Sequence, residues 1–374
     1  MKSYAPSKVI VDLNAYASNL HAIQGIIGEK SRIIAVVKAD AYGHGLIPIA
    51  RKAVEAGVSM LAVAHVDEGI CLREAGIKTP VLVMLQCSPD ALAAIVEYNL
   101  TLTVSDIATA ELLGSLAQRA DSVASIHCKV DTGMGRQGFL LESAVEDIQY
   151  LTRISHLDIE GISSHFSNAE IPDDSYTQGQ IRAFRQLLKV LDKVGIPYET
   201  SHIANSAGII NHTGSLLDLV RPGLLTYGIW PTDRIPEYTP IKPVLRWLSR
   251  VTQIRQLSAG ASIGYGRTFT TSAPMRVAVI PVGYGDGYLH SLSNCAEVLI
   301  HGRRCAVRGK VSMDQIVVDV TQISGIKSGD VVTLIGPDAQ EQIRVENLAK
   351  WANTIPYEIV TRIGNRVKRE YIGL

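Results

Sequence analysis

Apolar and polar residues follow two different patterns along the 374-residue chain, one before and one after a proline-rich segment near residue 237. From about residue 30 to 230, short apolar runs alternate with segments whose apolar residues repeat every three or four positions. These are the spacings of buried strands and amphipathic helices. The strand-like runs are RIIAVVK, SMLAVAH, TPVLVML, LTLTV, VASIHCKV, LDIEGISSHF, YETSHIANS and LLDLVRPG. Eight such alternating units predict an α/β fold, a (β/α)8 TIM barrel rather than an open sheet.

Start and stop signals support the helices of this pattern. The segment GLIPIARKAVEAG carries its apolar residues on one helical face, and Gly57 is expected to end it. In SPDALAAIVEYN, Ser88 is the expected N-cap and Pro89 the first helical residue. Ser105 is the expected N-cap of SDIATAELLGSLAQRA. We also expect a long helix over IRAFRQLLKVLDKVG.

The alternation ends at WPTDRIPEYTPIKP, where four prolines disfavour further helix. Beyond it, strand-like runs are separated by glycine-rich turns: VLRWLSRVTQI, MRVAVIPVGYGDGY, AEVLIHGRRCAVRG, QIVVDV and DVVTLIG. We therefore predict two domains, a barrel over residues 1–237 and a mainly β domain over residues 238–374. One short helix is expected within the second domain, near 345–352.

Composition narrows the class of protein. The sequence is 47% hydrophobic with a mean hydropathy of +0.15, which is typical of a large folded core. The 36 Lys and Arg residues balance 36 Asp and Glu residues, so no overall field favours nucleic acid or an anionic membrane. Five scattered cysteines suggest neither a disulfide framework nor a metal site. No secretory signal or membrane span is visible, and we expect a cytoplasmic protein.

The ends of the predicted barrel strands carry the candidate chemistry, since catalytic residues of this fold gather at the C-terminal ends of its strands. Lys38 closes the first strand, IIAVVK. Two interpretations fit a lone lysine there: a side chain that extends into solvent, or a desolvated amine of lowered pKa that forms a Schiff base.

The loops after the last two strands, ANSAG and RPG, match the place where this fold usually binds phosphate. Asn205, Ser206 and Gly223 suit that role, although each also fits ordinary turn chemistry. A lysine imine and a phosphate site in one barrel together suggest pyridoxal phosphate (PLP).

Arg221, at the end of the last strand, is placed to face the pyridine nitrogen of such a cofactor. An arginine cannot accept a proton, so the ring would stay neutral, which suits simple proton transfer. His165 ends the sixth strand, where it lies either against the ring or as a histidine of the core.

At this point the sequence resembles the alanine racemases. AVVKADAYGHG is similar to the cofactor-lysine signature of that family, and further motifs follow in the expected order over nearly the whole chain: VDTGMGRQG, GISSHFSNAE, ANSAG, VRPGLLTYG, GYGRTF, VGYGDGY, KVSMDQ and PYEIVTRIGNRVKREY. The resemblance implies a PLP-dependent homodimer that interconverts L- and D-alanine and supplies D-alanine for peptidoglycan. It also implies that the first residues, within APSKVIVDL, lie with the β domain.

The resemblance further implies roles for individual residues. Lys38 would hold PLP and act as the base on one face of the substrate, and Tyr265 would act on the opposite face, in trans from the partner subunit. Two bases are needed because a single base would return the proton to the face it left. From its position between two glycines alone, Tyr265 also fits an ordinary hairpin tyrosine. His165 next to Arg221 would help Tyr265 through a hydrogen-bonded chain.

The remaining implied roles concern cofactor, substrate and entrance. Arg136 and the Met313 backbone, the latter also in trans, would bind the substrate carboxylate. The residues expected around the phosphate are Tyr42, Ser206, Gly223 and Tyr357. Tyr284 and Asp314 would line the entrance.

Lys129, in IHCKVDTG, would place a second amine near Lys38. Similar proteins carry a carbamylated lysine at this position, and carbamylation would turn a repelling cation into a partner for Arg136. An unmodified lysine in an ion pair is the alternative. Ser312 precedes Met313 where some family members have cysteine.

Other functions remain open at this stage. A racemase of the same architecture could act on serine or on a broader set of amino acids. A decarboxylase of this barrel type is disfavoured, because no carboxylate is placed opposite the ring nitrogen. A non-catalytic PLP-homeostasis protein would resemble the first domain alone, and the β domain with Tyr265 argues against it.

Overall fold

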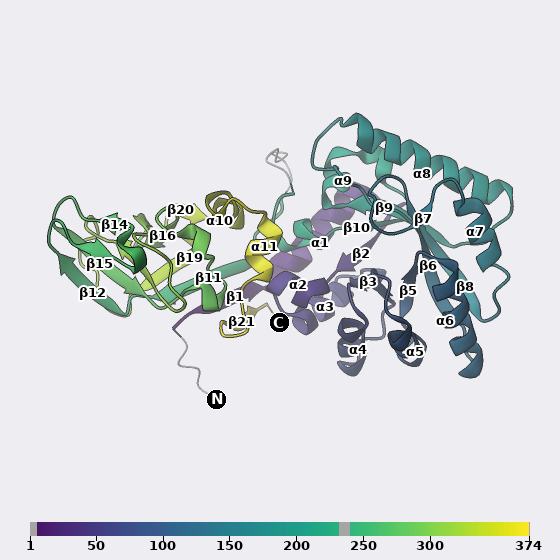
Figure 1. Cartoon of the computed structure of the whole chain (residues 1–374), viewed down its shortest axis with the longest axis horizontal. Helices are drawn as coiled ribbons and strands as arrows, with labels where there is room; N and C mark the ends of the chain where they lie inside the picture. The colour runs from purple at the N-terminus through teal and green to yellow at the C-terminus, as the bar shows by residue number, and fades with distance from the viewer. Residues whose placement is uncertain (1–5, 232–239, 374) are drawn as a thin grey trace.

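The computed structural model describes residues 6–231 and 240–373, and it divides into two lobes that meet end to end (Figure 1). The larger lobe is built on a closed ring of parallel strands, in the order β5-β4-β3-β2-β10-β9-β8-β6, with β6 pairing β5 to close it. These strands are β2 (Arg32–Val36), β3 (Met60–Val63), β4 (Val81–Val83), β5 (Thr101–Val104), β6 (Ala124–Asp131), β8 (Leu157–Ser163), β9 (Thr200–Asn205) and β10 (Leu219–Arg221). The predicted barrel is confirmed, since each of the eight apolar runs supplies one strand.

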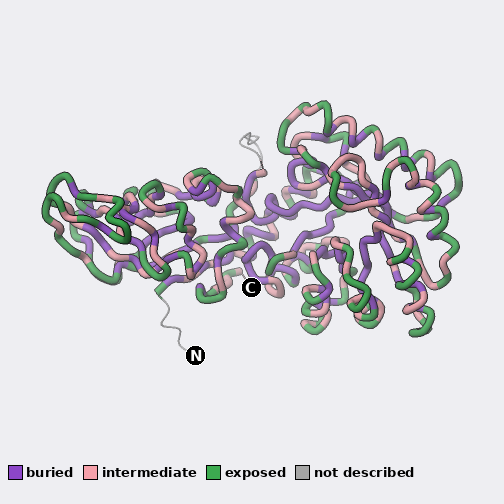
Figure 2. The backbone as a smooth tube through the Cα atoms, in the orientation of Figure 1, coloured by how far each residue is buried: buried purple, intermediate pink, exposed green. Residues whose placement is uncertain are grey.

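Helices cover the outside of the ring, and exposed residues alternate with buried ones along them (Figure 2). They are α1 (Leu13–Ile27), α3 (Leu46–Glu55), α4 (Val66–Glu74), α5 (Leu92–Glu97), α6 (Ile107–Arg119), α7 (Ala144–Leu151), α8 (Ser175–Lys193) and α9 (Ser206–Asn211). Short 3-10 turns lie at Pro89–Ala91 (η1), Thr213–Ser215 (η2) and Leu224–Tyr227 (η3), and β7 (Phe139–Leu140) adds a short strand beside β6. The ring strands themselves are almost completely buried, because helices pack on one side and strand side chains fill the other.

Some predicted helix starts are wrong by a residue or more. Asp106, not Ser105, caps α6, and its Oδ1 accepts a hydrogen bond from the Thr109 amide at 2.8 Å. A carboxylate at this position accepts the amide bond and also favours the positive end of the helix dipole. Ser88 and Pro89 do occupy the predicted N-cap and first position, but the element that they begin is the 3-10 turn η1, and the Ser88 side chain makes no capping bond. The helix α8 starts at Ser175, before the predicted apolar periodicity, because Asp174 caps it.

The second lobe is mainly β, as predicted. Its largest sheet has the order β17-β16-β19-β11-β1-β21, with β20 attached to β19; a second sheet has the order β12-β15-β18. The strands are β1 (Lys8–Asp12), β11 (Leu245–Arg250), β12 (Gln253–Leu257), β13 (Ser262–Ile263), β14 (Phe269–Thr270), β15 (Met275–Ile280), β16 (Glu297–Ile300), β17 (Arg303–Ala306), β18 (Ile316–Asp319), β19 (Val331–Asp338), β20 (Glu341–Ile343) and β21 (Lys368–Ile372). The predicted helix at 345–352 is confirmed as α10 (Val345–Ala352), and α11 (Pro356–Thr361) follows it. Short 3-10 turns lie at Tyr265–Arg267 (η4), Tyr284–Asp286 (η5) and His290–Leu292 (η6).

The start of the described chain belongs to the second lobe's sheet. Strand β1 pairs antiparallel with β11 and parallel with β21, so it lies between strands from the far end of the sequence. The chain then enters the barrel through α1. The predicted domain boundary between residues 237 and 238 lies outside the described residues, which stop at 231 and resume at 240.

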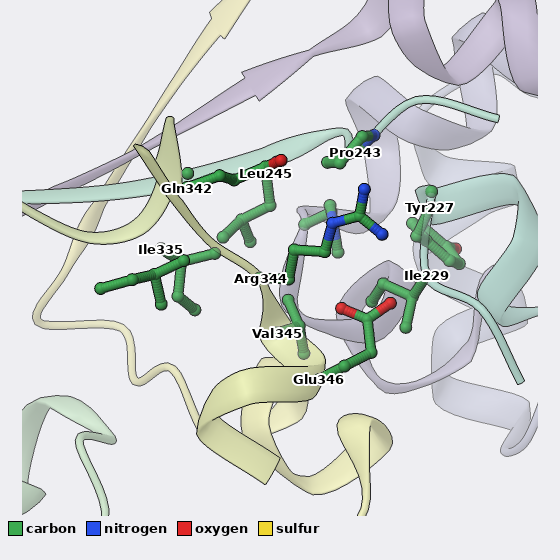
Figure 3. A pocket seen from close by; sticks show the side chains of 13 residues that line it. Tyr227, Ile229, Pro243, Leu245, Ile335, Gln342, Arg344, Val345 and Glu346 are labelled. Carbon is green, nitrogen blue, oxygen red and sulfur yellow. The ribbon is translucent and has the colours of Figure 1, made fainter. Parts of the chain in front are cut away.

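The two lobes are joined by specific polar and close contacts. The Asn19 side chain donates to the Thr226 and Lys242 carbonyls and accepts from the Lys242 amide at 2.7 Å. Where the chain passes between lobes, the side chains of a small pocket come from both sides, with Tyr227 and Ile229 on the barrel side and Arg344 and Glu346 on the other (Figure 3).

Helix α11 packs against the start of the barrel through a glycine contact. A Cβ on Gly43 would lie 2.2 Å from the Val360 carbonyl oxygen, so only glycine allows this approach. This contact places α11, and with it Tyr357, beside the turn that follows β2.

No helix within residues 6–231 and 240–373 has both the length and the apolar character that a membrane span requires.

Candidate active site

A pocket of about 70 Å³ lies toward the C-terminal ends of the barrel strands. It combines titratable side chains from several βα units: Lys38, Lys129, Arg136, His165, His202 and Arg221. The rest of the lining is apolar or hydroxylic: Leu82, Met84, Leu85, Thr103, Ser163 and Ser164. The structure therefore brings together the barrel residues that the sequence singled out as catalytic or as binding the substrate carboxylate.

Lys38 is followed by an unusual backbone. The four residues Ala39 to Tyr42 all have positive φ, between 52° and 55°, and form a left-handed helical turn within α2 (Lys38–Gly43). Each L-residue in this conformation costs roughly 1–2 kcal/mol. Tertiary hydrogen bonds hold the turn: Glu68 Oε1 accepts from the Ala39 amide at 2.6 Å, and Asp40 Oδ1 accepts from the Leu46 amide at 2.7 Å. Strain of this kind is characteristic of functional sites.

The two pocket lysines are both shifted toward the neutral amine. Burial lowers the pKa of Lys38, and the nearby Arg136 and Arg221 cations lower it further against the opposing effect of Glu68. Burial and the same arginines lower the pKa of Lys129 to about 8. A neutral amine is the nucleophilic form of lysine, so this environment favours covalent chemistry on both amines.

The two terminal nitrogens of Arg221 donate hydrogen bonds to acceptors on or directly after the neighbouring strands, and these bonds hold the side chain in place. Nη1 donates to His202 Nδ1 and to the His202 carbonyl, and Nη2 donates to the Ser164 carbonyl at 2.7 Å and the Ile203 carbonyl at 3.2 Å. Nη2 also lies 3.2 Å from His165 Nδ1. Within the described ranges the remaining Nε–H has no hydrogen-bond acceptor, and no carboxylate lies within 4.0 Å of the guanidinium.

His165 faces this cationic group as a neutral ring. Burial and then Arg221 hold the pKa of His165 well below its usual range. Because a guanidinium only donates, His165 Nδ1 is the acceptor of their contact and the ring proton lies on Nε2. His165 can therefore donate from Nε2 to a further oxygen.

Arg136 is positioned by the loop that carries it. The carboxylate of Asp131, at the end of β6, accepts from the amides of Gly133, Met134, Gly135 and Arg136 at 2.7–3.2 Å. These amides hold the pKa of Asp131 below its usual range against the effect of burial, so it remains a carboxylate. The loop is thus wrapped around one anion, which directs Arg136 to the pocket rim.

A hydroxyl cradle lies beside the pocket, where α9, β10 and α11 meet. Ser206 Oγ accepts from the Gly223 amide at 2.9 Å and the Leu225 amide at 3.3 Å. A Cβ on Gly223 would lie 2.5 Å from the Tyr42 hydroxyl, and the Tyr42 ring centroid is 5.9 Å from that of Tyr357. Asn205 has a structural role, since its Oδ1 caps α9 through the Gly208 amide at 2.8 Å.

These residues fit PLP. Lys38 supplies an amine, and the Arg221 Nε–H supplies an unpaired donor for the ring nitrogen. The Gly223 backbone lies against the Tyr42 and Ser206 hydroxyl groups, which suit phosphate.

The predicted second base, the predicted backbone donor to the substrate carboxylate and the two predicted entrance residues lie in the β lobe and do not line the pocket: Tyr265, Met313, Tyr284 and Asp314. Tyr265 is 74% exposed on η4 and Met313 is 52% exposed, both in the β lobe. Tyr284 lies on η5 beside Met313, since the Gly285 amide donates to the Met313 carbonyl at 2.9 Å. Asp314 is ion-paired with Arg366 at 2.8 Å.

The structure adds two residues that sequence reasoning missed. His202 binds Arg221 directly, and its only sequence signal is a polar residue inside the apolar strand run YETSHIANS. Asp131 could have been found from its position before a glycine-rich segment, since aspartate commonly binds nearby amides in such turns.

Comparisons with known proteins show the family to which the chain belongs. Residues 11–231 match the family "Alanine racemase, N-terminal domain", and residues 244–371 match "Alanine racemase, C-terminal domain". An alanine racemase of Halothermothrix orenii is 42% identical over 98% of this chain and 97% of its own length.

Solved structures agree over the whole fold. An alanine racemase of Clostridium difficile 630 is 33% identical with a TM-score of 0.95, covering 99% of this chain and 97% of that one. An alanine racemase from Bartonella henselae, described with covalently bound pyridoxal phosphate, is 30% identical with a TM-score of 0.89, covering 98% of this chain and all of that one.

Proposed function

The chain belongs to the alanine racemase family, a family of isomerases, and on that premise we propose that it interconverts L- and D-alanine with PLP by a two-base mechanism. The observation that carries the proposal is the pairing of Lys38, an amine of lowered pKa, with Arg221, a buried guanidinium with an unpaired N–H. When bound, PLP withdraws electrons from the substrate and makes its Cα–H bond acidic.

Lys38 holds the cofactor and moves the proton of Cα on one face. Its lowered pKa lets the amine accept a proton near neutral pH. Tyr265 serves the opposite face, because inversion needs a proton to leave one side and return to the other. Tyrosine has an ordinary pKa near 10, so it needs a neighbour that stabilises its anion. The His165 Nε2–H, backed by Arg221, is suited to that role.

Arg221 restricts the chemistry to proton transfer. A guanidinium donates to the ring nitrogen without giving up its proton, so the ring stays unprotonated and draws electrons less strongly. Charge then stays close to Cα, where Lys38 and Tyr265 act, and side reactions elsewhere on the cofactor are disfavoured.

Arg136 and the Met313 amide bind the substrate carboxylate. The Met313 carbonyl is occupied by Gly285, whereas its amide has no acceptor among the described residues. Ser206, Tyr42, Tyr357 and Gly223 surround the phosphate, and Tyr284 and Asp314 line the entrance.

Lys129 carries a carbamate in this proposal. An unmodified ammonium would be a further cation beside Lys38, Arg136 and Arg221. A carbamate anion instead accepts hydrogen bonds from Arg136 and fixes the arginine for the substrate.

The working unit is a homodimer. Tyr265 and Met313 are exposed on the β lobe of one chain, outside its pocket, and a two-fold dimer brings them to the pocket of the partner subunit. We place the enzyme in the cytoplasm, supplying D-alanine for peptidoglycan.

A racemisation assay on a panel of amino acids tests the proposed substrate. Alanine should be racemised with the highest kcat/KM, and serine and basic amino acids far more slowly. A higher kcat/KM for serine would show that serine, not alanine, is the preferred substrate, and it would leave the proposed mechanism unchanged. PLP binding without racemisation of any amino acid would overturn the enzymatic function.

A further inference from the structure

Arg221 is the end of a buried polar chain that crosses the barrel core. Behind it, on β9, lies His202; behind His202, on β6, lies His127; and Glu160 on β8 lies beside His127. His127 Nδ1 is 2.6 Å from His202 Nε2, and both rings are at most 1% exposed. No step of the proposed mechanism uses His127 or Glu160.

The Arg221 guanidinium determines where the ring protons of His202 and His127 lie. Arg221 only donates, so His202 Nδ1 is an acceptor and the proton of the neutral ring is on Nε2. His202 Nε2–H must then donate to His127 Nδ1, which places the His127 proton on Nε2. The His127 Nε2 atom is buried, has no hydrogen-bond partner in the described part of the chain, and lies 3.7 Å from Glu160 Oε2.

The barrel is shaped locally to hold this arrangement. Gly161 lies opposite His127, and a Cβ there would lie 2.9 Å from the imidazole, so the glycine makes room for the ring. The pairing of β6 with β8 shifts register at this point: Ile126 pairs with Ile159, but His127 pairs with Gly161. Glu160 is therefore the extra residue of a bulge, a feature that typically redirects a side chain.

Glu160 is held as an anion at this position. His127 lowers the pKa of Glu160 more than burial raises it, and Thr101 Oγ1 donates to Glu160 Oε2 at 3.1 Å. Burial and Arg221 hold the pKa of His202 well below its usual range, so this ring is neutral. The series of side chains thus begins at the Arg221 cation and ends at the Glu160 carboxylate. Each of the two imidazoles between them has its proton on the nitrogen that faces Glu160.

We propose that Glu160 and His127 are positioning residues for the reaction: through His202 they fix the orientation of Arg221 and offset its buried charge. This inference rests on the proposed function, in which Arg221 faces the cofactor ring. Glu160 supplies the negative charge that Arg221 lacks in its immediate surroundings, and it does so without placing a carboxylate where it would protonate the ring.

Removing the Glu160 carboxylate would remove the charge that fixes which ring nitrogen of each histidine carries the proton. Without that anion the buried His127 Nε2–H loses the negative charge that lies 3.7 Å away and offsets its burial, which is costly for a desolvated donor. Both rings can then reverse, which turns a His202 N–H toward the Arg221 guanidinium. Two donors cannot bond each other, so Arg221 rotates away from its place.

Histidine ¹⁵N NMR of the wild-type holoenzyme tests the proton positions without any variant. The pair is identified by the coupling across the His202–His127 hydrogen bond, and both rings should be neutral with the proton on Nε2 at neutral pH. A proton on Nδ1 of either ring, a charged ring, or the absence of an N–H···N coupling would overturn the proposal.

Glu160→Gln tests the effect on Arg221, with Glu199→Gln as its matched control. Glu199 is exposed on the neighbouring strand segment, and its amide donates to the Glu160 carbonyl at 3.1 Å, so both variants remove one charge from the same end of the barrel. We expect Glu160→Gln to lower kcat roughly tenfold at nearly unchanged KM for alanine, the lower end of what an orienting partner contributes elsewhere. It should also give mixed histidine tautomers and a shifted absorption band of bound PLP, and Glu199→Gln should change none of these.

The outcomes separate this inference from the proposed function. One outcome is that the wild-type enzyme racemises alanine while Glu160→Gln matches Glu199→Gln in kcat, histidine tautomers and absorption spectrum. That result would overturn this inference and leave the proposed function standing. Wild-type protein that racemises no amino acid would overturn the proposed function, and the NMR result would still decide the proton positions. If Glu160→Gln does not fold, the wild-type NMR measurement alone decides.

Discussion

Four basic side chains share one small pocket, and burial together with their mutual repulsion explains the chemistry assigned to two of them. Lys38 and Lys129 lie with Arg136 and Arg221, and arginine cannot lose its proton at accessible pH. The lysines are therefore the groups that become neutral. Neutral amines bind carbonyl carbon, which Lys38 would find in PLP and Lys129 in carbon dioxide.

Replacing Lys38 by alanine should remove both the covalent link to the cofactor and one of the two bases. We expect almost complete loss of racemisation, and no cofactor attached to the chain after borohydride reduction, measured by mass. Lys30→Ala is the control, because Lys30 is exposed just before the same strand, β2. Cofactor still fixed to a lysine in the Lys38→Ala protein would show that another residue holds it.

Lys129 should carry an added carboxyl group, and its amount should depend on pH in a defined direction. Carbon dioxide reacts with the neutral amine, and a pKa of about 8 leaves roughly a tenth of the amine neutral at pH 7, a fraction that grows as the pH rises. Acid treatment should remove the group and bicarbonate should restore it, as followed by ¹³C NMR with labelled bicarbonate. A Lys129→Ala protein with the same ¹³C signal would refute the assignment.

At the scale of elements, the barrel was predictable and the turn that follows Lys38 was not. A barrel strand such as β3 is buried on both of its faces, so all of its residues are apolar. Such a run can be recognised from the residue types alone. The left-handed turn from Ala39 to Tyr42 contains no glycine, so its sequence carries no signal for positive φ. Glu68, which holds it, comes from another βα unit. Tertiary contacts also explain the pairing of His202 with Arg221, which no local pattern records.

The strain in this turn can be measured with a single substitution. Glycine adopts positive φ freely, so Ala39→Gly should remove about 1–2 kcal/mol of strain, offset by about 0.5–1 kcal/mol from the more flexible unfolded chain. We expect the free energy of unfolding to stay the same or to rise by up to about 1.5 kcal/mol in denaturant titrations.

The control for this prediction is Ala93→Gly in α5, an exposed alanine in a right-handed helix. There the same change should lower the free energy of unfolding by about 1 kcal/mol. Equal losses in both variants would mean that the turn stores no strain at Ala39.

At the scale of the whole molecule, the proposed mechanism needs two bases that one chain does not bring into the same pocket. The barrel supplies Lys38, whereas Tyr265 lies exposed on a lobe that extends away from the barrel (Figure 1). Sequence motifs singled out both residues, but a motif does not show how far apart two residues lie in space. A two-fold dimer makes two composite sites, each with Lys38 from one chain and Tyr265 from the other.

Mixing two inactive variants tests this arrangement. Lys38→Ala and Tyr265→Phe homodimers should each be nearly inactive, because every site lacks one base. After dissociation, mixing in equal amounts and reassociation, about half of the dimers are mixed, and one of their two sites has both native residues. Roughly a quarter of the wild-type racemisation rate should return, measured per site after subunit exchange is confirmed by mass.

The same mixture distinguishes the alternative in which both bases come from one chain. In that case each chain of a mixed dimer still carries its own defect, so no site is complete and mixing restores nothing. Because the variants differ from wild type by single side chains on different lobes, a recovered rate cannot come from either homodimer. Recovery near a quarter therefore requires that Tyr265 reach the Lys38 pocket of the partner subunit, and confirmed exchange without recovery would show that Tyr265 is not a base in trans.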